Sequence, residues 1–288
     1  MPKDITIVIG PTAIGKSDFA IAKALETSAE IISADAFQVY KGMDIGTAKV
    51  SAEIRSEIPH HLIDIKCPDE EYSVADFMQL SEKIIASLRQ QHKPIIICGG
   101  TGFYINAFMR GFEFPDVKQN SQIRKELQEK ALVHGNVSLW DQLQQIDPVS
   151  AAALEPNDQK RIIRALEIYY QTNVVPSSLK KRAANIRPDI HIIGLNAPRE
   201  IIYDKINIRV DQMYQNGLIE EVETLLKKYE ESLNAFEAIG YKETIQYLKG
   251  RISKQEMIEL VKRKTRNFAK RQLTWYRRFE NVQWLETI

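Results

Sequence analysis

A glycine-rich stretch near the start of the chain restricts the fold more than any other feature of the sequence. Residues 10–17 read Gly-Pro-Thr-Ala-Ile-Gly-Lys-Ser and match the phosphate-loop pattern GxxxxGK[ST] in full. An apolar, β-branched run at residues 5–9 precedes them, and apolar residues with helical spacing follow over residues 17–25. Strand, glycine-rich turn and helix are the context that this pattern requires, so we predict a bound phosphate or diphosphate at the first strand-to-helix turn.

Each part of this loop has an expected role. Backbone N–H groups of the loop and of the helix N-terminus surround a phosphate, and Lys16 supplies a positive charge. The Ser17 hydroxyl is a predicted ligand of Mg²⁺, the one cofactor that we expect. The alternative is a glycine-rich turn without function. The residues predicted to bind the diphosphate are Gly10, Pro11, Thr12, Ala13, Ile14, Gly15, Lys16 and Ser17.

Alternating strand and helix patterns predict the fold class. Buried strands are expected over residues 29–34, 94–98 and 190–195. Ser73, with Asp76 three positions later, forms a variant of the capping box and predicts the start of a helix that ends before Pro94. Strands that alternate with helices favour an α/β fold, here a P-loop NTPase-like parallel sheet flanked by helices.

Two changes in pattern define the predicted domains. Between residues 115 and 188 the sequence is polar, Gln-rich and broken by prolines, and strand patterns largely vanish. From Pro198 onward the pattern is helical almost to the end, and Val261, Phe268 and Trp275 at heptad spacing predict a buried stripe on a long final helix. We therefore expect a catalytic core from residues 1–114 and 189–288, with a helical C-terminal segment, and an all-helical insertion domain at residues 115–188.

Asp35 follows the second predicted strand, at the edge where ligands bind in open α/β sheets. A carboxylate there can act as a general base or help to place Mg²⁺, unless it only caps a helix or closes a turn. In ATPases an acid at the end of an apolar strand holds the metal, but here the candidate strand ends in Cys98-Gly99-Gly100. This departure weakens the ATPase and GTPase interpretations.

A second glycine-rich turn over residues 99–104 places Thr101 at the carboxyl edge of the preceding strand. Its glycines allow close backbone approach, which makes Thr101 a second candidate site residue, with a plain tight turn as the alternative. The adjacent His60 and His61 point to opposite faces of an extended segment. Packing is therefore favoured over joint metal ligation for this pair.

Positive charge is concentrated near the C-terminus. Residues 262–278 hold eight Lys and Arg and no Asp or Glu, although the whole chain has 39 basic and 38 acidic residues. A solvated helix face would normally include acids, so this segment is predicted to bind the phosphates of a nucleic acid. The smaller group at residues 180–182 is left open between binding and solvation. On a helix the C-terminal cations form two stripes beside the apolar seam, one with Arg263, Arg266, Lys270 and Arg277 and the other with Lys264, Arg271 and Arg278.

Several further blocks along the chain occur together in one known family. They are residues 33–40 (Ser-Ala-Asp-Ala-Phe-Gln-Val-Tyr), 42–49 (Gly-Met-Asp-Ile-Gly-Thr-Ala-Lys), 60–64 (His-His-Leu-Ile-Asp), 99–104, 157–167 (Asn-Asp-Gln-Lys-Arg-Ile-Ile-Arg-Ala-Leu-Glu), 209–211 (Arg-Val-Asp), 240–243 (Gly-Tyr-Lys-Glu) and 270–277 (Lys-Arg-Gln-Leu-Thr-Trp-Tyr-Arg). With the phosphate loop, they resemble the tRNA dimethylallyltransferase (tRNA isopentenyltransferase) family. The resemblance spans nearly the whole chain.

The resemblance implies an activity. It implies transfer of a dimethylallyl group from dimethylallyl diphosphate to the exocyclic amine of the adenosine 3′-adjacent to the anticodon of a tRNA, with Mg²⁺. An adenine amine is a poor nucleophile, so a base must take its proton as the new bond forms, and Asp35 matches the catalytic aspartate of the family. The leaving diphosphate gains charge, which Lys16 and, by the resemblance, Thr101 and Arg209 would stabilise.

The same resemblance implies how tRNA is held. The target base must leave its stack, at a cost of a few kcal/mol that contacts to the anticodon stem-loop offset. The insertion domain and the C-terminal basic helix would hold the stem through its phosphates. A side-chain hydrogen bond to RNA is not expected at Ala36, which stands where the family usually has Ser. The expected tRNA-binding residues are Asp35, Ala36, Phe37, Gln38, Thr101, Gln159, Lys160, Arg161, Ile162, Ile163 and Arg271.

Three other functions fit parts of the sequence. A P-loop kinase of small molecules or nucleotides would also combine a phosphate loop with an acid after the second strand, and ATP turnover would distinguish it. An adenylate prenyltransferase would have little need for a basic C-terminal helix. A non-catalytic RNA-binding protein has no reason to retain Lys16, Ser17 and Asp35 together.

The remaining features concern location and assembly. The start of the chain has no signal-peptide or transit-peptide pattern, and no apolar run reaches the length of a membrane span. Two cysteines, Cys67 and Cys98, are too few for a disulfide framework. We therefore expect a cytoplasmic protein without membrane contact, and a monomer.

Overall fold

The chain forms two units, each described here by itself. The computed structural model describes residues 4–114, 117–179 and 186–287. The core unit consists of Met1–Met109 and Arg187–Ile288, and the insertion unit of Arg110–Ile186. The chain therefore leaves the core unit after its first half and returns to complete it.

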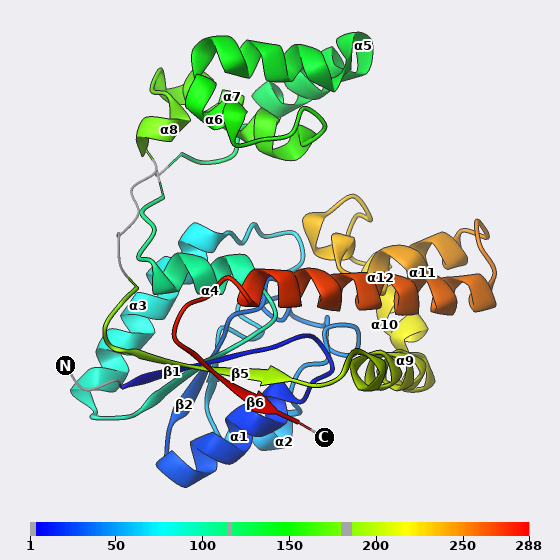
Figure 1. The fold of residues 1–288 in the computed structure, drawn as a ribbon. Helices are drawn as coiled ribbons and strands as arrows, with labels where there is room; N and C mark the ends of the chain where they lie inside the picture. Colours follow the sequence, from blue (N-terminus) through cyan, green and yellow to red (C-terminus); the bar gives the residue numbers. More distant parts are fainter. Residues whose placement is uncertain (1–3, 115–116, 180–185, 288) are drawn as a thin grey trace. The chain divides into compact units, whose positions relative to one another are not determined.

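A sheet of six parallel strands forms the centre of the core unit (Figure 1). Its order is β3-β2-β4-β1-β5-β6, so that β1 lies between β4 and β5, with Ile7 of β1 opposite Ile97 and Ile192. The predicted α/β fold with a parallel sheet is confirmed. The strands are β1 (Ile5–Ile9), β2 (Glu30–Ser33), β3 (His60–His61), β4 (Ile95–Cys98), β5 (Ile190–Asn196) and β6 (Val282–Glu286).

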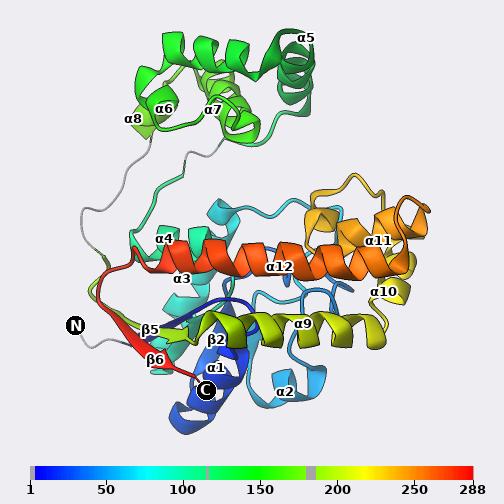
Figure 2. The same ribbon diagram turned by 45° about the vertical axis from the view of Figure 1, so that its right-hand side comes forward.

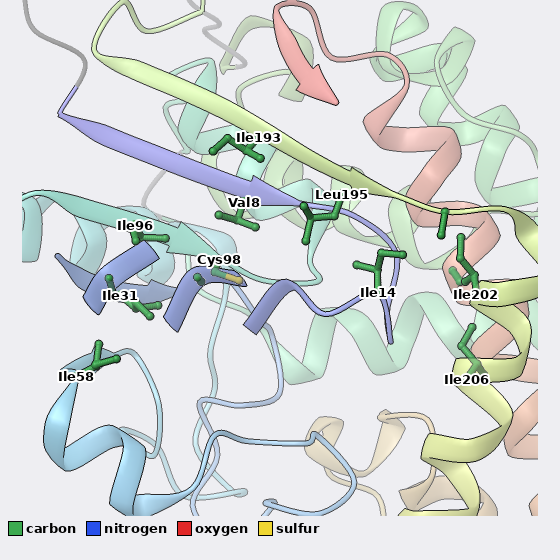
Figure 3. Packing of buried hydrophobic residues seen from close by; sticks show 14 of the residues in the cluster. Val8, Ile14, Ile31, Ile58, Ile96, Cys98, Ile193, Leu195, Ile202 and Ile206 are labelled. Carbon is green, nitrogen blue, oxygen red and sulfur yellow. The ribbon is translucent and has the colours of Figure 1, made fainter. Parts of the chain in front are cut away.

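Helices cover both faces of this sheet. Val8 and Ile96 point from the sheet into an apolar cluster that includes Ala20 and Ala24 of α1 (Figure 3). Because successive side chains of a strand alternate, Ile7 faces the other side, which α3 and α4 cover (Figure 1). The helices of the core unit are α1 (Lys16–Thr27), α2 (Ala52–Glu57), α3 (Val74–Gln90), α4 (Gly102–Met109), α9 (Arg199–Gln215), α10 (Leu218–Leu226), η1 (Asn234–Glu237), α11 (Tyr241–Leu248) and α12 (Lys254–Tyr276).

Local sequence explains where several of these helices begin. The Ser73 side chain accepts from the backbone N–H of Asp76, and the Asp76 carboxylate accepts from the backbone N–H of Ser73, so the predicted capping box at α3 is confirmed. The same reciprocal arrangement joins Ser253 and Glu256 at the start of α12. Both helices therefore have fixed starting points, which positions their buried faces.

The prediction of a C-terminal segment that is helical almost to its end was wrong for residues 282–286. These residues form β6, which pairs with β5 at the sheet edge, Val282 opposite Ile192 and Trp284 opposite Gly194. A Cβ on Gly194 would lie 2.5 Å from the Trp284 ring, so glycine makes room for the indole. The two-residue strand β3 was not predicted either.

The predicted apolar stripe on the final helix was also wrong. Trp275 is 38% exposed, whereas Tyr276 is buried and Val261 lies in the apolar cluster of the sheet. A strict heptad drifts around a straight helix by about 20° per repeat, so residues 268 and 275 turn away from the core. The buried face of α12, which packs against α9, α11 and α4 (Figure 2), consists of Met257, Val261, Ala269, Gln272 and Tyr276.

The insertion unit contains only helices within its described residues, as predicted for this segment. Its buried centre includes Leu139, Ile162 and Leu166. Glu167 is fully buried and accepts hydrogen bonds from the guanidinium groups of Arg124 and Arg164, which tie α7 to the start of α5. The helices are α5 (Ser121–Ile146, kinked at Gly135), α6 (Pro148–Ala152), α7 (Gln159–Thr172) and α8 (Pro176–Leu179).

Among the described residues, none of the helices has both the length and the apolar character that crossing a membrane requires.

Candidate active site at the carboxyl edge of the sheet

Three loops meet where β1, β4 and β2 end. These strands are neighbours in the sheet and all run in the same direction, so the loops that follow them lie side by side. The phosphate loop follows β1, the Gly99–Thr101 turn follows β4, and Asp35 follows β2. Residues distant in sequence are thus brought to one edge, as the positions of Asp35 and Thr101 after their strands predict.

The backbone of the phosphate loop turns sharply between β1 and α1. Gly10 and Gly15 have φ angles of 151° and 98°, and a Cβ on Gly10 would lie 2.7 Å from the Leu195 carbonyl oxygen. Ala13 also has a positive φ, 65°, an uncommon conformation for a residue with a side chain. Ile14 anchors the loop by packing beside Leu195 (Figure 3). The shape of the loop is therefore set by its glycines and by the packing of Ile14.

Lys16 is the first residue of α1 and extends over the loop. Its ammonium donates a hydrogen bond to the Pro11 carbonyl oxygen at 2.8 Å. Burial, helped by the charge of Arg209, lowers the pKa of Lys16 to about 8 against the opposing effects of Cys98 and Asp35. The fold disfavours the charged form of a lysine whose pKa is this close to neutral pH, and a bound anion would stabilise that charged form. Ser17, the predicted metal ligand, is exposed on the first turn of the same helix.

Arg209 reaches the same edge from α9, far away in the sequence. Burial lowers the pKa of its guanidinium, and only the more distant charges of Asp35 and Asp18 oppose this effect. Within the described parts of the chain, neither Lys16 nor Arg209 forms an ion pair with a carboxylate. Two partly buried cations that repel each other and lack a carboxylate partner are suited to bind a multiply charged anion.

Asp35 combines a structural role with an accessible oxygen. Its Oδ1 accepts from the backbone N–H groups of Phe37 and Gln38 at 2.9 and 3.3 Å, so the turn-forming role that we considered for this residue is present. Its Oδ2 points toward Gly100, where a Cβ would lie 3.3 Å away. One oxygen therefore fixes the carboxylate, and the other faces the meeting point of the loops.

Thr101 links the loops after β4 and β2. Its hydroxyl accepts from the Ala36 backbone N–H at 3.0 Å, and its own N–H donates to the Ala34 carbonyl oxygen at 3.1 Å. A Cβ on Gly99 would lie 2.2 Å from that same oxygen, so glycine is required there. The Gly-Gly-Thr sequence thus lets the two backbones touch and holds Thr101 beside Asp35.

Comparisons with known proteins agree with this geometry. A profile of the IPP transferase family matches residues 38–279. The chain belongs to this family. A tRNA dimethylallyltransferase of Alkaliphilus oremlandii is 46% identical over 286 residues, which cover 99% of this chain and 91% of the relative. Our prediction of membership in the tRNA dimethylallyltransferase family is therefore confirmed.

Solved structures of the family lead to the same assignment. The full-length tRNA isopentenylpyrophosphate transferase of Bacillus halodurans is 41% identical with a TM-score of 0.71, over 99% of this chain and 90% of that one. A eukaryotic dimethylallyltransferase acting on tRNA is 27% identical with a TM-score of 0.84, over 99% of this chain and 74% of that one.

The residues expected to touch tRNA are located in both units. In the core unit, the Ala36 N–H is bonded to Thr101, and the Gln38 side-chain amide bonds Ser33 and the Thr47 carbonyl oxygen. Phe37 is partly exposed. In the insertion unit, residues 159–163 begin α7. Ile162 and Ile163 are buried in the centre of that unit, so only the side chains of Gln159, Lys160 and Arg161 are open to a ligand there.

The basic face of α12 is smaller than its sequence indicates. Lys264 bonds the buried carboxylate of Glu243 at 2.6 Å, and Lys262 pairs with Asp211 at 2.8 Å. Arg266 donates to the Asn207 side chain. Among the eight cations of residues 262–278, those that stay exposed are Arg263, Lys270, Arg271, Arg277 and Arg278. Residues 180–182, the smaller basic group, lie outside the described residues.

The histidine pair has a packing role. His61 Nε2 lies 2.7 Å from the Glu30 carboxylate, and His60 Nδ1 lies 2.7 Å from the Ile58 carbonyl oxygen. In the parts of the chain that the structure describes, no group of three His, Cys, Asp or Glu residues is arranged to hold a metal ion.

One residue of this edge was missed. Gln272 of α12 bonds both the phosphate loop and the Gly100 carbonyl oxygen. The sequence offered two signals for it: its place in the family block at residues 270–277, and its position four residues before Tyr276 on the buried face of α12.

Proposed function

We propose that this chain transfers a dimethylallyl group from dimethylallyl diphosphate to the exocyclic amine of the adenosine 3′-adjacent to the anticodon of a tRNA. The observation that carries this proposal is the pair of partly buried cations without a carboxylate partner among the described residues, Lys16 and Arg209, at the edge where Asp35 lies. A diphosphate supplies the negative charge that this pair lacks. Family membership and the named relatives support a prenyl-transferring enzyme that acts on tRNA.

The reaction needs a base and a site for the leaving group. A bond forms between the adenine amine nitrogen and C1 of the prenyl group, while the bond from C1 to the diphosphate oxygen breaks. Asp35 accepts the proton that the amine loses, through the oxygen that faces the meeting point of the loops. Its other oxygen, held by two backbone N–H groups, keeps the carboxylate oriented during this step.

The leaving diphosphate carries more charge than the bound donor. Lys16, the loop N–H groups and Arg209 are positioned to stabilise this added charge, and Thr101 lies between the diphosphate site and Asp35. Because Lys16 now bonds the Pro11 carbonyl oxygen, diphosphate binding would exchange that neutral partner for an anion.

The residues present fit a magnesium ion at this loop. Mg²⁺ is usually held by one or two protein oxygens together with substrate phosphates and waters. Ser17 offers an exposed hydroxyl on the first turn of α1, and the exposed carboxylate of Asp18 is next to it. When bound, the ion would neutralise part of the diphosphate charge.

The tRNA anticodon stem-loop is the proposed partner. Exposed cations on α12, among them Arg271, and Lys160 and Arg161 at the start of α7 would contact its phosphates. Residues 35–38 and Thr101 would line the space that the extruded adenosine enters. We propose that the protein works in the cytoplasm as a monomer.

Incorporation of label from dimethylallyl diphosphate into tRNA tests this function. We expect incorporation into a transcript with adenosine beside the anticodon, and none when guanosine replaces that adenosine. Asp35→Ala should lower the turnover number by at least about 100-fold. Unchanged turnover in Asp35→Ala would refute the role of this base. Absence of incorporation by the wild-type chain, together with ATP turnover on a small acceptor, would instead favour a kinase.

A further inference from the structure

The carboxamide of Gln272 joins two loops of the candidate site. Its Oε1 accepts from the Thr12 backbone N–H, and its Nε2 donates to the Gly100 carbonyl oxygen, each at 2.8 Å. The residue is 4% exposed. One buried side chain of α12 is therefore bonded both to the diphosphate loop and to the turn that follows β4.

The bridge lies directly beside the catalytic groups. A Cβ on Gly100 would lie 3.1 Å from Gln272 Nε2 and 3.3 Å from Asp35 Oδ2. Thr101, the next residue, bonds the Ala36 N–H. Gln272 thus connects the loop that holds the diphosphate with the turn that contacts the proton acceptor.

A second residue of α12 supports the same contact. Tyr276 is fully buried and its hydroxyl donates to the Gly100 carbonyl oxygen at 3.4 Å. Residues four positions apart lie on one face of a helix, so α12 presents both donors to this single carbonyl group. The position of the turn after β4 is therefore set by α12 as well as by the sheet.

We propose that Gln272 is a positioning residue for prenyl transfer. Its carboxamide fixes the distance between the diphosphate loop and Asp35, and therefore the distance between the donor carbon and the group that takes the amine proton. This inference rests on the proposed function. Misplacement of reacting groups by about 1 Å lowers rates by about 100-fold, so a loss of this spacing acts on turnover. Donor binding depends on Lys16 and Arg209, whereas the hydrogen bonds of Gln272 go to the Thr12 N–H and the Gly100 carbonyl oxygen.

The backbone N–H of Thr12, within the phosphate loop, is engaged by Gln272. A phosphate loop ordinarily directs its N–H groups at the anion. Here the Thr12 N–H is already satisfied by Gln272 Oε1. Its hydrogen bond therefore serves the geometry of the loop, and the N–H groups nearer the start of α1 are left to hold the diphosphate.

Gln272→Met is the principal test, because methionine keeps the length of the side chain and removes both hydrogen bonds. We expect the turnover number to fall by about 10- to 100-fold, with KM for the prenyl donor and Kd for tRNA within about threefold of wild type. Gln272→Glu keeps the acceptor for Thr12 and loses the donor to Gly100, so it should show a loss of the same kind. Gln255→Met, on the exposed first turn of α12, is the matched control and should equal wild type.

Gly100→Ala tests the bridge from its other side. The added methyl would displace Gln272 by a few tenths of an ångström without removing its carboxamide. We expect a drop in turnover in the direction of Gln272→Met. Because the same methyl would also lie 3.3 Å from Asp35 Oδ2, Gln272→Glu, which leaves Gly100 unchanged, decides the question if Gln272→Met does not fold.

The outcomes separate this inference from the proposed function. Failure of wild type and Gln255→Met to modify tRNA overturns the proposed function itself. If both are active, turnover within about threefold of wild type in Gln272→Met and Gly100→Ala overturns the positioning role. So does a loss of turnover that matches the unfolded fraction, measured by thermal unfolding of each variant, because a purely structural residue would behave in that way.

Discussion

The two ends of the central sheet treat their charged side chains in opposite ways. At the amino ends of the strands, the Arg89 guanidinium donates to Asp4 at 2.6 and 2.8 Å and to Asp189 at 2.6 Å. These contacts lower the pKa of Asp4 and raise that of Arg89, and hydrogen bonds from Arg187 and Arg89 hold the pKa of Asp189 at about 2 against the effect of burial. The charges of Asp4, Arg89 and Asp189 are thus each stabilised by a partner within the chain.

At the carboxyl ends of the strands, two cations lack a carboxylate partner among the described residues. Burial lowers the pKa of both Lys16 and Arg209, which means that the fold disfavours their charged forms. Selection for stability alone would pair such cations with carboxylates, as Arg89 is paired with Asp4 and Asp189 at the amino ends. The contrast indicates that the fold leaves charge uncompensated where a ligand is to supply the missing partner.

Lys16→Met should produce the largest effect. Without the ammonium, kcat/KM for the prenyl donor should fall by about 100- to 1000-fold, because the leaving diphosphate loses a cation. The free energy of unfolding at pH 7 should rise by about 1–2 kcal/mol, since a charge that the fold disfavours is removed. Donor kinetics and urea unfolding measure the two quantities. A variant that loses both activity and stability would show that Lys16 is a structural residue like Arg89.

Arg89→Met removes the guanidinium that pairs with Asp4 and Asp189 at the amino ends of the strands. It leaves two carboxylates without their guanidinium, and we expect the free energy of unfolding to fall by about 1–3 kcal/mol, with screening at this partly exposed site limiting the loss. Turnover per folded molecule should stay at the wild-type value. The folded pKa of Asp189 is below its usual value, so its stabilising effect is present above about pH 4 and is lost as the pH falls toward 2. Urea unfolding at pH 7 and pH 3 should therefore show a smaller acid dependence in Arg89→Met.

The pH dependence of kcat/KM for the prenyl donor tests whether the fold disfavours the charged form of Lys16. Because the pKa of Lys16 in the free protein is about 8, its ammonium is charged below that pH and becomes neutral above it. We expect kcat/KM for the donor to fall above pH 8 by up to about tenfold per pH unit. In Lys16→Arg the guanidinium stays charged, so this decline should disappear. A wild-type profile that stays flat to pH 10 would contradict the lowered pKa.

The smallest effect concerns the surface of α12. Arg271 is exposed, so Arg271→Ala should weaken tRNA binding by about threefold and reduce the salt slope of log Kd by about one. Lys264 is the matched comparison because its ammonium bonds the buried Glu243 carboxylate. Lys264→Ala should lower the free energy of unfolding and leave the salt slope unchanged. Equal salt slopes for the two variants would refute this division of the basic face.

Sequence patterns predicted the parts of the fold that are specified locally. The strands β1, β2, β4 and β5 are short segments rich in isoleucine, and the capping box of Ser73 and Asp76 lies within one turn of helix. β3 has two residues and β6 is a short edge strand with exposed side chains, so neither has a periodic apolar pattern to detect. Their pairing depends on neighbours distant in the sequence.

The candidate site follows the same rule. Lys16, Asp35 and Thr101 come directly after strands, and a parallel sheet brings such positions together, so their place in the site was predictable. Arg209 sits on α9 with no local motif, and only the family resemblance indicated it. Gln272 was missed because a buried glutamine on an apolar helix face has no meaning until its two partners are known.

The sheet order also determines when the site is completed during synthesis. The phosphate loop, Asp35 and Thr101 all belong to the part of the chain made before the insertion unit. β5, Arg209 and Gln272 are made only after it, and β1 must wait for β5 to gain its second neighbour. Domains tend to fold in the order of their synthesis. A nascent chain therefore carries Asp35, the proposed base, and the phosphate loop first, and it acquires Arg209 and the Gln272 bridge only after the insertion unit has been made.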